Sequence, residues 1–509
     1  MGRLRMLSTA ADYHDLTSYD RNRMSGHSLD WSNQPVTFKT YHGLKHIELA
    51  GNEGDSSSSQ NLDELLHTKA ALTPVSMNFD TLSRVLKLSH CLTRKERVAG
   101  GYFYFRNVAS AGALYPSEMY FCSSGTEGLE QGLYHHSPAT QSIVMLRNGN
   151  CLEALLRSIN FQDHKSTRMV FLLTAIFFRS SWKYRDRAFR YHLLDTGHLI
   201  ENLTLALKSE KLGFEISYDF DDARINELIG VDTNREACLA AVGILLQQDA
   251  TKIELGKDIS PTTDLKSFSK CSSSEIRYPA INEIYSVTSK TSKFDPTLSI
   301  ENQVSVVNSV MGLVELPSVQ NGPEAITFAE ALFQRRSRRN FVRKPVPVAT
   351  FSWLMGLLNF GDSCGEIAPS KGCMSVGVLI GDVETIDPGF YLFEAGNHAL
   401  SLIRPGLLTE EMAHICLDQE WLGRCSLHFV FLSNLEATEN KWGSRGYRYA
   451  MLEAGRLGQR LYLAAESIKY GCCGIGAFYD KESKSLLSLR SGSSMLYLVA
   501  LGPLKKAFV

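Results

Sequence analysis

The sequence predicts an α+β protein in which one domain occurs twice along the chain. Residues 187–222 align without a gap to residues 445–480, at a constant offset of 258. Each copy also combines the apolar spacing of a long helix with strand-like stretches. A repeat of this length is a whole domain rather than one unit of a solenoid. We therefore expect two copies of one fold, joined head to tail as a fused pair with its own pseudo-two-fold axis.

The long helix is the best-matched part of the repeat. RAFRYHLLDTGHLIENLTLALK in the first copy and RGYRYAMLEAGRLGQRLYLAAE in the second are identical at nine of 22 positions. Strand-like stretches open at Gly132 in the first copy and at Gly389 in the second. Residues 495–502 (MLYLVALG) are predicted to form a closing strand, because apolar residues dominate them.

Changes in composition divide the chain into four segments. Residues 1–75, rich in His, Ser, Asp and Gly, are expected to form an irregular N-terminal arm. Residues 76–250 form the first domain and residues 322–509 the second. The stretch between them, 251–321, is rich in Ser, Thr and Lys, and it is too long for an ordinary loop. We expect it to be a linker that crosses the surface between the copies.

Composition excludes several classes of protein. The 53 Lys and Arg nearly balance the 54 Asp and Glu, so no overall field attracts nucleic acid or anionic lipid. No apolar run is long enough to be a signal peptide or a membrane span. The 11 cysteines are scattered, without zinc-like CxxC pairs, which indicates reduced thiols, a cytoplasmic protein and no metal site.

A basic cluster opens the second copy. RRSRRNF (335–341) contains Arg335, Arg336, Ser337 and Arg339, which together make a plausible phosphate site because guanidinium groups offer paired donors. A solvated charge run at the end of a helix is the alternative. The equivalent stretch of the first copy, near 65–71, has one lysine and no arginine.

The first copy has a small-residue loop that the second largely lacks. Ala109, Ser110, Ala111 and Gly112 would let a flat ligand or a phosphate approach the backbone closely, although an ordinary turn before a strand is the alternative. The second copy keeps only a remnant at 369–372.

The segment after the long helix also differs between the copies. The second copy has Ile475, Gly476 and Ala477 where the first has Ser217, Tyr218 and Asp219. Glycine would leave the backbone open to a planar ring, whereas Tyr218 would fill that space. The two copies thus look complementary, and a site assembled across their interface would be complete only once.

Lys183 and Tyr184 form a candidate proton-transfer pair. A lysine beside a phenol can move protons if burial lowers the pKa of the lysine. A surface lysine next to a packed tyrosine is the alternative. His198, in DTGHL, is expected to have a packing or hydrogen-bonding role.

Taken together, these motifs resemble the nitroreductase superfamily, and within it the SagB-type dehydrogenase branch that includes azoline oxidases. RRSRRNF matches the R-R-S-x-R-x-F opening of the superfamily. ASAGALYP (109–116) is similar to the PSAGALYP of that branch, with Ala109 in place of proline. Residues 13–41 look like the branch's arm, and residues 183–198 match its KY…RY…D.GH pattern.

The resemblance implies two nitroreductase-like three-layer domains, fused as an intramolecular pseudo-dimer, with FMN at the interface. Arg335, Ser337 and Arg339 would hold the FMN phosphate and ribitol, or the pyrimidine edge of the flavin. A basic residue after the last strand, Lys505 or else Lys506, would help to hold the phosphate. Because the copies are complementary rather than equal, we expect one FMN per chain.

The resemblance also implies which residues meet the ring and the substrate. Gly476 and Ala477 would lie along the isoalloxazine near N5, and the loop at 109–111 would reach across from the other copy. Lys183 and Tyr184 match the pair regarded as catalytic in azoline oxidation.

These expectations describe an FMN-dependent oxidoreductase that acts on a small molecule or a modified peptide. Two alternatives stay open. One is an NAD(P)H-dependent nitro- or quinone reductase, and the other is a flavin-binding scaffold of a biosynthetic complex.

Overall fold

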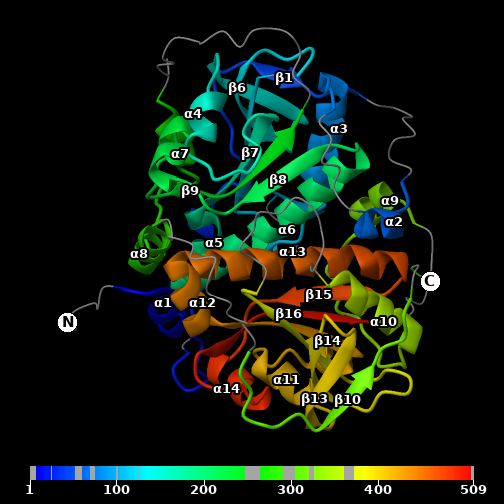
Figure 1. Cartoon of the computed structure of the whole chain (residues 1–509). Coiled ribbons are helices and arrows are strands. Elements are labelled where there is room, and N and C mark those ends of the chain that lie inside the picture. The colour runs from blue at the N-terminus through cyan, green and yellow to red at the C-terminus, as the bar shows by residue number, and fades with distance from the viewer. Residues whose placement is uncertain are drawn as a thin grey trace, which may run out of the picture.

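Two seven-stranded antiparallel sheets enclose a pair of long helices (Figure 1). The computed structural model describes residues 7–24, 26–51, 60–68, 75–98, 101–124, 126–246, 264–290, 304–319, 322, 326–359 and 372–505. The helices α6 (Ala188–Ser209) and α13 (Gly446–Ser467) lie between the sheets and pack against each other. Nearly every residue of both helices is buried, because each helix covers a sheet on one face and its partner on the other.

Both sheets have the same strand order, which confirms the predicted duplication and the α+β class. The first sheet runs in the order β1 (His46–Glu48), β6 (Ser142–Asn148), β5 (Gly132–Ser137), β4 (Ser117–Ser123), β7 (Thr167–Ile176), β9 (Glu236–Leu245), β8 (Gly213–Ser217). The second runs in the order β10 (Gly312–Glu315), β13 (Ala399–Pro405), β12 (Gly389–Glu394), β11 (Ser375–Ile380), β14 (Leu427–Asn434), β16 (Ser493–Gly502), β15 (Gly471–Ile475). The predicted closing strand is thus part of β16, next to the edge strand.

The remaining helices cover the sheets and their ends. In the first half they are α2 (Leu62–His67), α3 (Phe79–Ser89), α4 (Leu152–Leu156), α5 (Phe177–Tyr184) and α7 (Asp222–Ile229). In the second half they are α9 (Phe328–Gln334), α10 (Val348–Leu357), α11 (Thr409–Ile415), α12 (Leu435–Trp442) and α14 (Asp480–Leu486).

A glycine at the same place in each long helix allows the two helices to touch. A Cβ atom added at Gly197 would lie 2.1 Å from the carbonyl oxygen of Leu452, and one at Gly455 would lie 2.2 Å from that of Leu194. These residues are paired in the sequence repeat, so the contact is reciprocal. The halves therefore face each other across a pseudo-two-fold axis through this crossing.

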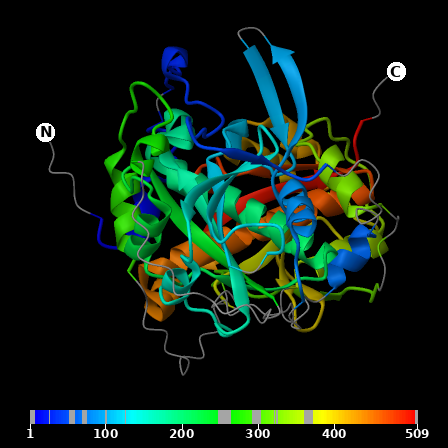
Figure 2. The same cartoon turned by 90° about the horizontal axis from the view of Figure 1, so that it is seen from above.

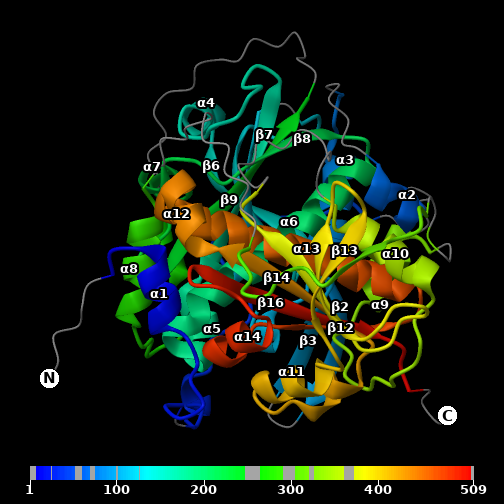
Figure 3. The ribbon, with the colours of Figure 1, turned by 60° about the horizontal axis from the view of Figure 1, so that its bottom comes forward.

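The arm carries a helix that joins the two halves. Helix α1 (Ala10–Leu16) lies beside α12 of the second half (Figure 3). Arg187 and Arg190 of the first half both reach Asp480 of the second, at 2.7 Å each. The same two guanidinium groups donate to the carbonyl oxygens of Thr17 and His14. The arm thus closes over a buried ion cluster that bridges the halves.

The linker repeats this arrangement on the other side. Its helix α8 (Pro279–Thr288) provides the carbonyl oxygens of Tyr285 and Thr288 to Arg448 and Arg445. Both arginines also reach Asp222, at 2.6 and 2.5 Å. Helices α1 and α8 therefore hold equivalent places, so the arm and the linker contain matching elements of the duplicated unit. The predicted junction between residues 250 and 251 lies outside the described residues.

A two-stranded ribbon leads into the small-residue loop. Strands β2 (Leu92–Val98) and β3 (Gly101–Arg106) pair with each other only, and they stand out from the body (Figure 2). No helix among the described residues is long and apolar enough to cross a membrane. The ten cysteines in the described part of the chain are all buried.

Candidate active site

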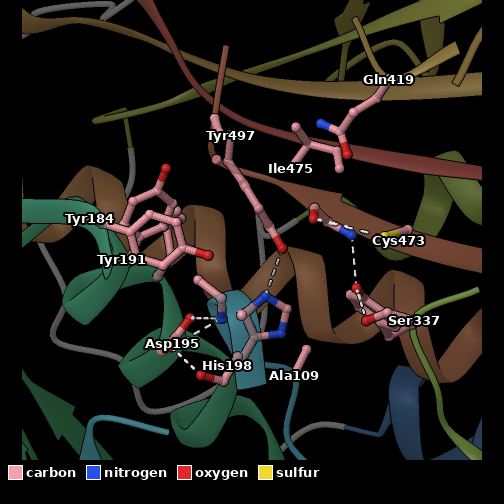
Figure 4. A pocket seen from close by; sticks show the side chains of 18 of the residues that line it. Ala109, Tyr184, Tyr191, Asp195, His198, Ser337, Gln419, Cys473, Ile475 and Tyr497 are labelled. Atoms are coloured by element: carbon pink, nitrogen blue, oxygen red, sulfur yellow. Dashed lines mark hydrogen bonds between the residues drawn. The ribbon is translucent and has the colours of Figure 1, made fainter. Parts of the chain in front are cut away.

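A pocket opens between the two halves, at one side of the crossing of α6 and α13 (Figure 4). It holds about 720 Å³ of space that no protein atom fills, including its mouth. The first half lines it with Ala109, Ser110, Ala111, Gly112, Tyr184, Tyr191, Leu194, Asp195 and His198. The second half contributes Ser337, Arg339, Gln419, Tyr462, Cys473, Gly474, Ile475, Gly476, Ala477 and Tyr497. Most of the predicted site residues are therefore gathered in one place.

The small-residue loop has an unusual backbone. Gly112, Ala113 and Tyr115 all have positive φ, at 65°, 54° and 47°. The Ser110 hydroxyl accepts from the Tyr115 N–H at 2.9 Å, and it donates to Asp195 at 2.6 Å. Left-handed residues are unfavourable except for glycine, so these side-chain contacts stabilise the turn.

Gly112 brings the loop against the candidate proton-transfer pair. A Cβ atom there would lie 2.9 Å from the Tyr184 hydroxyl and 3.3 Å from the Lys183 ammonium nitrogen. Lys183 and Tyr184 are in the last turn of α5, and the Lys183 nitrogen lies 5.4 Å from the centre of the Tyr184 ring. Lys183 is beside the pocket, while Tyr184 lines it.

The pKa values of the two members of the pair are shifted in opposite directions. Burial, and then the positive charge of Arg339, lower the pKa of Lys183. Burial, and then the charge of Asp195, raise the pKa of Tyr184. The amine is therefore the easier of the two groups to use as a base, and the phenol stays protonated.

The basic cluster begins where α9 ends. Thr327 caps that helix in a capping box with Glu330, and the chain then turns at Arg335. The Arg338 N–H donates to the carbonyl of Cys472 at 3.0 Å, which fixes the segment beside β15. Ser337 and Arg339 consequently face the pocket.

The other basic residues of the cluster lie outside the pocket lining. The guanidinium group of Arg335 is buried and donates to the carbonyl oxygens of Asn107 and Arg106, at 2.9 and 2.8 Å. Its Nη1 atom has no hydrogen-bond partner among the described residues. Arg336 lies over the ring of Phe105 instead.

Lys505 lies at the C-terminal end of the described chain, and Lys506 lies outside the described residues. Its N–H donates to the carbonyl of Asn340 at 2.8 Å, so the backbone there runs beside the basic cluster. Its side chain is exposed and does not line the pocket.

The glycines of the 474–476 segment are required by neighbouring tyrosines. A Cβ atom at Gly476 would lie 2.5 Å from the Tyr191 ring, and one at Gly474 would lie 1.7 Å from the Tyr497 hydroxyl. Tyr191 and Tyr497 thus occupy the side-chain directions of these two glycines. The backbone from Gly474 to Ala477 still lines the pocket.

Tyr462 couples this backbone to the basic cluster. Its hydroxyl accepts from the Gly474 N–H at 2.7 Å and lies 2.9 Å from the Ser337 hydroxyl. The two pieces of the second half that line the pocket are thus held by one side chain of α13.

Sequence reasoning missed Asp195 as a site residue. It is 5% exposed, and it also accepts from the Ala111 N–H at 3.1 Å. Burial raises its pKa to about 7, although the hydrogen bonds from Ser110 and Ala111 favour the charged form. A signal was available, because Asp195 is part of the D.GH pattern one helical turn before His198.

His198 connects the halves, in keeping with the hydrogen-bonding role expected for it. Its Nδ1 lies 2.8 Å from Gln459 Oε1, and its Nε2 lies 3.1 Å from the Tyr497 hydroxyl. Burial, opposed by the bond to Gln459, lowers its pKa to about 4. The imidazole is therefore neutral at physiological pH and orients Tyr497 at the pocket wall.

The equivalent position on the other side of the crossing is filled by buried charges. Glu453 corresponds to Asp195, and it accepts from the Tyr218 hydroxyl at 2.6 Å. Arg456, which corresponds to His198, reaches Glu453 at 3.2 Å and Glu201 at 3.0 Å. The remnant loop at 369–371 lies outside the described residues. Among those that are described, this second interface site is closed by its own side chains.

The arrangement can bind a flat ligand that has an anionic end. Backbone at 109–112 and 474–477 supplies the walls, and Ser337 and Arg339 supply donors. Lys183, Tyr184 and Asp195 can hold or move protons at the opposite wall.

Comparison with known proteins agrees with the duplicated architecture. The nitroreductase family model matches the chain twice, at residues 71–244 and 332–503. A crystal structure of a protein from Anabaena variabilis, named as a nitroreductase, has a TM-score of 0.78 and covers 98% of this chain and 100% of that one. At 24% identity, this likeness concerns the fold.

Three other proteins are similar in sequence. MJ1384 of Methanocaldococcus jannaschii, named as a nitroreductase, is 28% identical over 182 residues, or 35% of this chain and 90% of that protein. The microcin B17-processing protein McbC of Escherichia coli is 28% identical over 141 residues, which are 26% of this chain and 52% of McbC. The trifolitoxin-processing protein TfxB of Rhizobium leguminosarum bv. trifolii is 25% identical over 182 residues, or 34% and 48%. The chain spans about half the length of these two processing proteins. With both halves matched by the family model, the chain belongs to the nitroreductase family as a tandem of two of its domains, and its similarity to McbC and TfxB supports the SagB-type branch that the motifs indicate.

Proposed function

We propose that this nitroreductase-family oxidoreductase works with FMN, one molecule of which binds in the interdomain pocket. The observation that carries the proposal is the asymmetry of the two interface sites. One is an open pocket lined by both halves, whereas Glu453, Arg456 and Tyr218 fill its equivalent. Pockets between units are common places for cofactors.

The residues present fit such a group. Ser337 and Arg339 offer a hydroxyl and a guanidinium group at the pocket wall, and Arg335 has a buried Nη1 without a partner among the described residues. These three would hold the phosphate and ribitol, with Lys505 as a further cation. Gly476 and Ala477 would lie along the ring.

The protein's part in the reaction would be to orient the substrate and to handle protons. When bound, FMN would supply hydride transfer through its N5 atom. Lys183 would act as the base, since burial and Arg339 lower its pKa, and Tyr184 would donate a hydrogen bond as a neutral phenol.

The substrate would be an azoline-like compound, another small organic molecule or a modified peptide. The names of the microcin B17-processing protein McbC and the trifolitoxin-processing protein TfxB support this class. The name of MJ1384 favours an NAD(P)H-dependent nitro- or quinone reductase as the second candidate. A flavin-binding scaffold of a biosynthetic complex is the third. A cytoplasmic location stays a prediction.

The test is a pair of measurements on the purified full chain. Flavin absorbance and chromatography of the released cofactor should identify FMN. Lys183→Ala combined with Tyr184→Phe should keep FMN bound and slow substrate oxidation by about 10²–10⁴-fold, the usual range for loss of a general base. Normal turnover in this variant would remove the catalytic assignment.

Activity with different substrates separates the candidates. Oxidation of NAD(P)H with nitroaromatics or quinones, well above the rate with free FMN, would favour the reductase. Bound FMN with no turnover of either kind would favour the scaffold, and a colourless protein would contradict the proposal itself.

A further inference from the structure

The carboxyl group of Asp195 is buried at the pocket without a cation beside it. Its partners are the Ser110 hydroxyl, at 2.6 Å, and the Ala111 N–H. No described Lys, Arg or His forms an ion pair with it. Buried carboxylates normally have such a partner, because an unpaired buried charge is strongly unfavourable. Asp195 is therefore poised to be neutral or charged according to what lies in the pocket.

The duplication provides an internal comparison. Glu453, at the matching position of the second half, lies 3.2 Å from the guanidinium group of Arg456 and also accepts from Tyr218. That pairing places a positive charge directly beside the carboxyl group of Glu453. In the first half, His198 stands where Arg456 stands in the second, and its imidazole is neutral. The open site has thus lost the cation that would fix the charge of the carboxylate.

A small inner cavity lies on the far side of Asp195. It is lined by Asp195, Ser110, His90 and Arg106, among others, and about 10 Å³ of it is open to the centre of a water molecule. This is roughly the room that one water needs. His90 Nδ1 and Arg106 Nε, which are both buried, have no partner among the described residues. A water held by these donors could also solvate Asp195, which would let the carboxyl change charge without leaving the interior.

The titratable groups that face Asp195 come from several elements. They are Tyr191 and His198 on α6, Tyr184 on α5, His90, Arg106 and Tyr115 around the inner cavity, and Arg339, Tyr462, Cys473 and Tyr497 from the second half.

We propose that Asp195 is a second proton-exchange residue of this site, which accepts the proton that Lys183 takes from the substrate. The inference rests on the proposed function. Oxidation removes a hydride and a proton from the substrate, and FMN, when bound, would supply the acceptor for the hydride. The Lys183 amine becomes an ammonium ion and then returns to the amine by giving a proton to the Tyr184 hydroxyl oxygen, while the hydroxyl's own proton passes to the Asp195 carboxylate. Lys183 and Tyr184 both lie against Gly112, and the charge of Asp195 acts on Tyr184. Asp195 receives the proton from Lys183 by way of Tyr184 and does not touch the substrate. It is therefore a positioning residue and not a catalytic one.

The direct test does not need a working enzyme. Cofactor-free protein is titrated with base and acid while the infrared absorption of protonated carboxyl groups is followed. One carboxyl should titrate near pH 7, and Asp195→Asn should abolish that step. Glu453→Gln, the same change at the matching position of the closed site, should leave it in place. A step that survives in Asp195→Asn, or no step near neutral pH in any form, overturns the proposal.

A second variant separates proton exchange from support of the loop. Asn can still accept from Ser110 and Ala111, so Asp195→Asn should keep FMN bound yet lower kcat by roughly tenfold or more. In the wild type, kcat should rise with pH near neutrality as Asp195 becomes a carboxylate that can accept the proton. In Asp195→Asn, this rise should be absent. Ser110→Ala removes a donor to the charged form, so it should move the carboxyl titration to higher pH while the step persists. If Asp195→Asn keeps full kcat, or if Asp195→Asn and Ser110→Ala both lose FMN to the same degree, Asp195 only supports the loop and the proposal is overturned.

Discussion

At the scale of single residues, a few positions decide whether an interface site is open or closed. The pair His198 and Gln459 of the open side becomes Arg456 and Glu201 on the other. Both pairs bridge the same helices, but only the second pair brings full charges. A buried charged pair must be packed and hydrogen-bonded on all sides to be tolerated, and this fills the space that a ligand would need.

The unusual carboxyl of Asp195 should affect stability in a defined pH window. Its pKa is about 7 in the folded chain, above the usual 3.8, so ionisation favours unfolding. The stability that the protonated Asp195 carboxyl contributes is fully present below about pH 4, and it is lost as the pH rises to about 7. The free energy of unfolding of Asp195→Asn, measured relative to that of the wild type, should therefore increase by about 2–3 kcal/mol from pH 5 to pH 8. Denaturant unfolding of both proteins at pH 5 and at pH 8 measures this change. The prediction is contradicted if the difference in unfolding free energy between the two proteins is the same at both pH values.

The pocket-lining residues that could be predicted from the sequence are those that belong to a contiguous motif. Ser337, Arg339 and Gly476 could be found because small, basic or hydroxyl side chains cluster at short spacing in one half and are missing from the other. Arg335 belongs to the same motif, but its guanidinium group mainly binds backbone carbonyls of the first half. Carbonyl acceptors leave no trace in a sequence, so its depth in the interface could not be predicted.

At the scale of elements, the crossing of α6 and α13 holds the molecule together. The two glycines at this crossing let a carbonyl of each helix lie against the Cα of the other. Nearly every residue of these two helices is buried against a sheet or against the other helix, so few positions can change freely. This explains why the long helix is the best-preserved part of the repeat. The repeat itself could be read from the sequence, because buried positions on both faces of this helix constrain nearly every residue.

A methyl group at this crossing should separate the helices. In Gly197→Ala, the new Cβ would lie 2.1 Å from a backbone oxygen, which cannot move aside as a side chain can. We expect a loss of about 1–3 kcal/mol or more of unfolding free energy, together with weaker retention of FMN. Gly312→Ala is the matched control, because no atom lies within 4 Å of the added Cβ there. Equal stability of the two variants in chemical denaturation would refute this role of Gly197.

The equivalence of α1 and α8 was not predictable in the same way. Helix α1 presents the carbonyls of His14 and Thr17, and α8 presents those of Tyr285 and Thr288, to matching arginine pairs. The interaction uses backbone oxygens at a helix end and one threonine hydroxyl on each side, since Thr17 and Thr288 accept from Arg190 and Arg448 at 3.1 and 2.8 Å. Only the threonine position therefore had a reason to stay alike in the two sequences. The arm and the linker therefore look unrelated in sequence although they do the same structural work.

At the scale of the whole molecule, fusion allowed the two interface sites to diverge. In a homodimer, any change that closes one site closes both, because the subunits are identical. In this chain, Tyr218 and Arg456 fill one site while their counterparts Gly476 and His198 line the other. The duplication and its asymmetry were visible in the sequence, whereas the ion network that closes the second site became clear only in three dimensions.

The central claim is tested most directly by counting FMN on the full chain. Cofactor-free protein titrated with FMN, and followed by flavin fluorescence or calorimetry, should saturate at one FMN per chain. Ser337→Ala with Arg339→Ala should weaken this binding by roughly tenfold or more, since two donors to the ligand are lost, whereas Tyr218→Phe in the closed site should not change it. Two FMN per chain, or a single FMN whose binding responds to Tyr218→Phe and not to the Ser337 and Arg339 changes, would contradict the account.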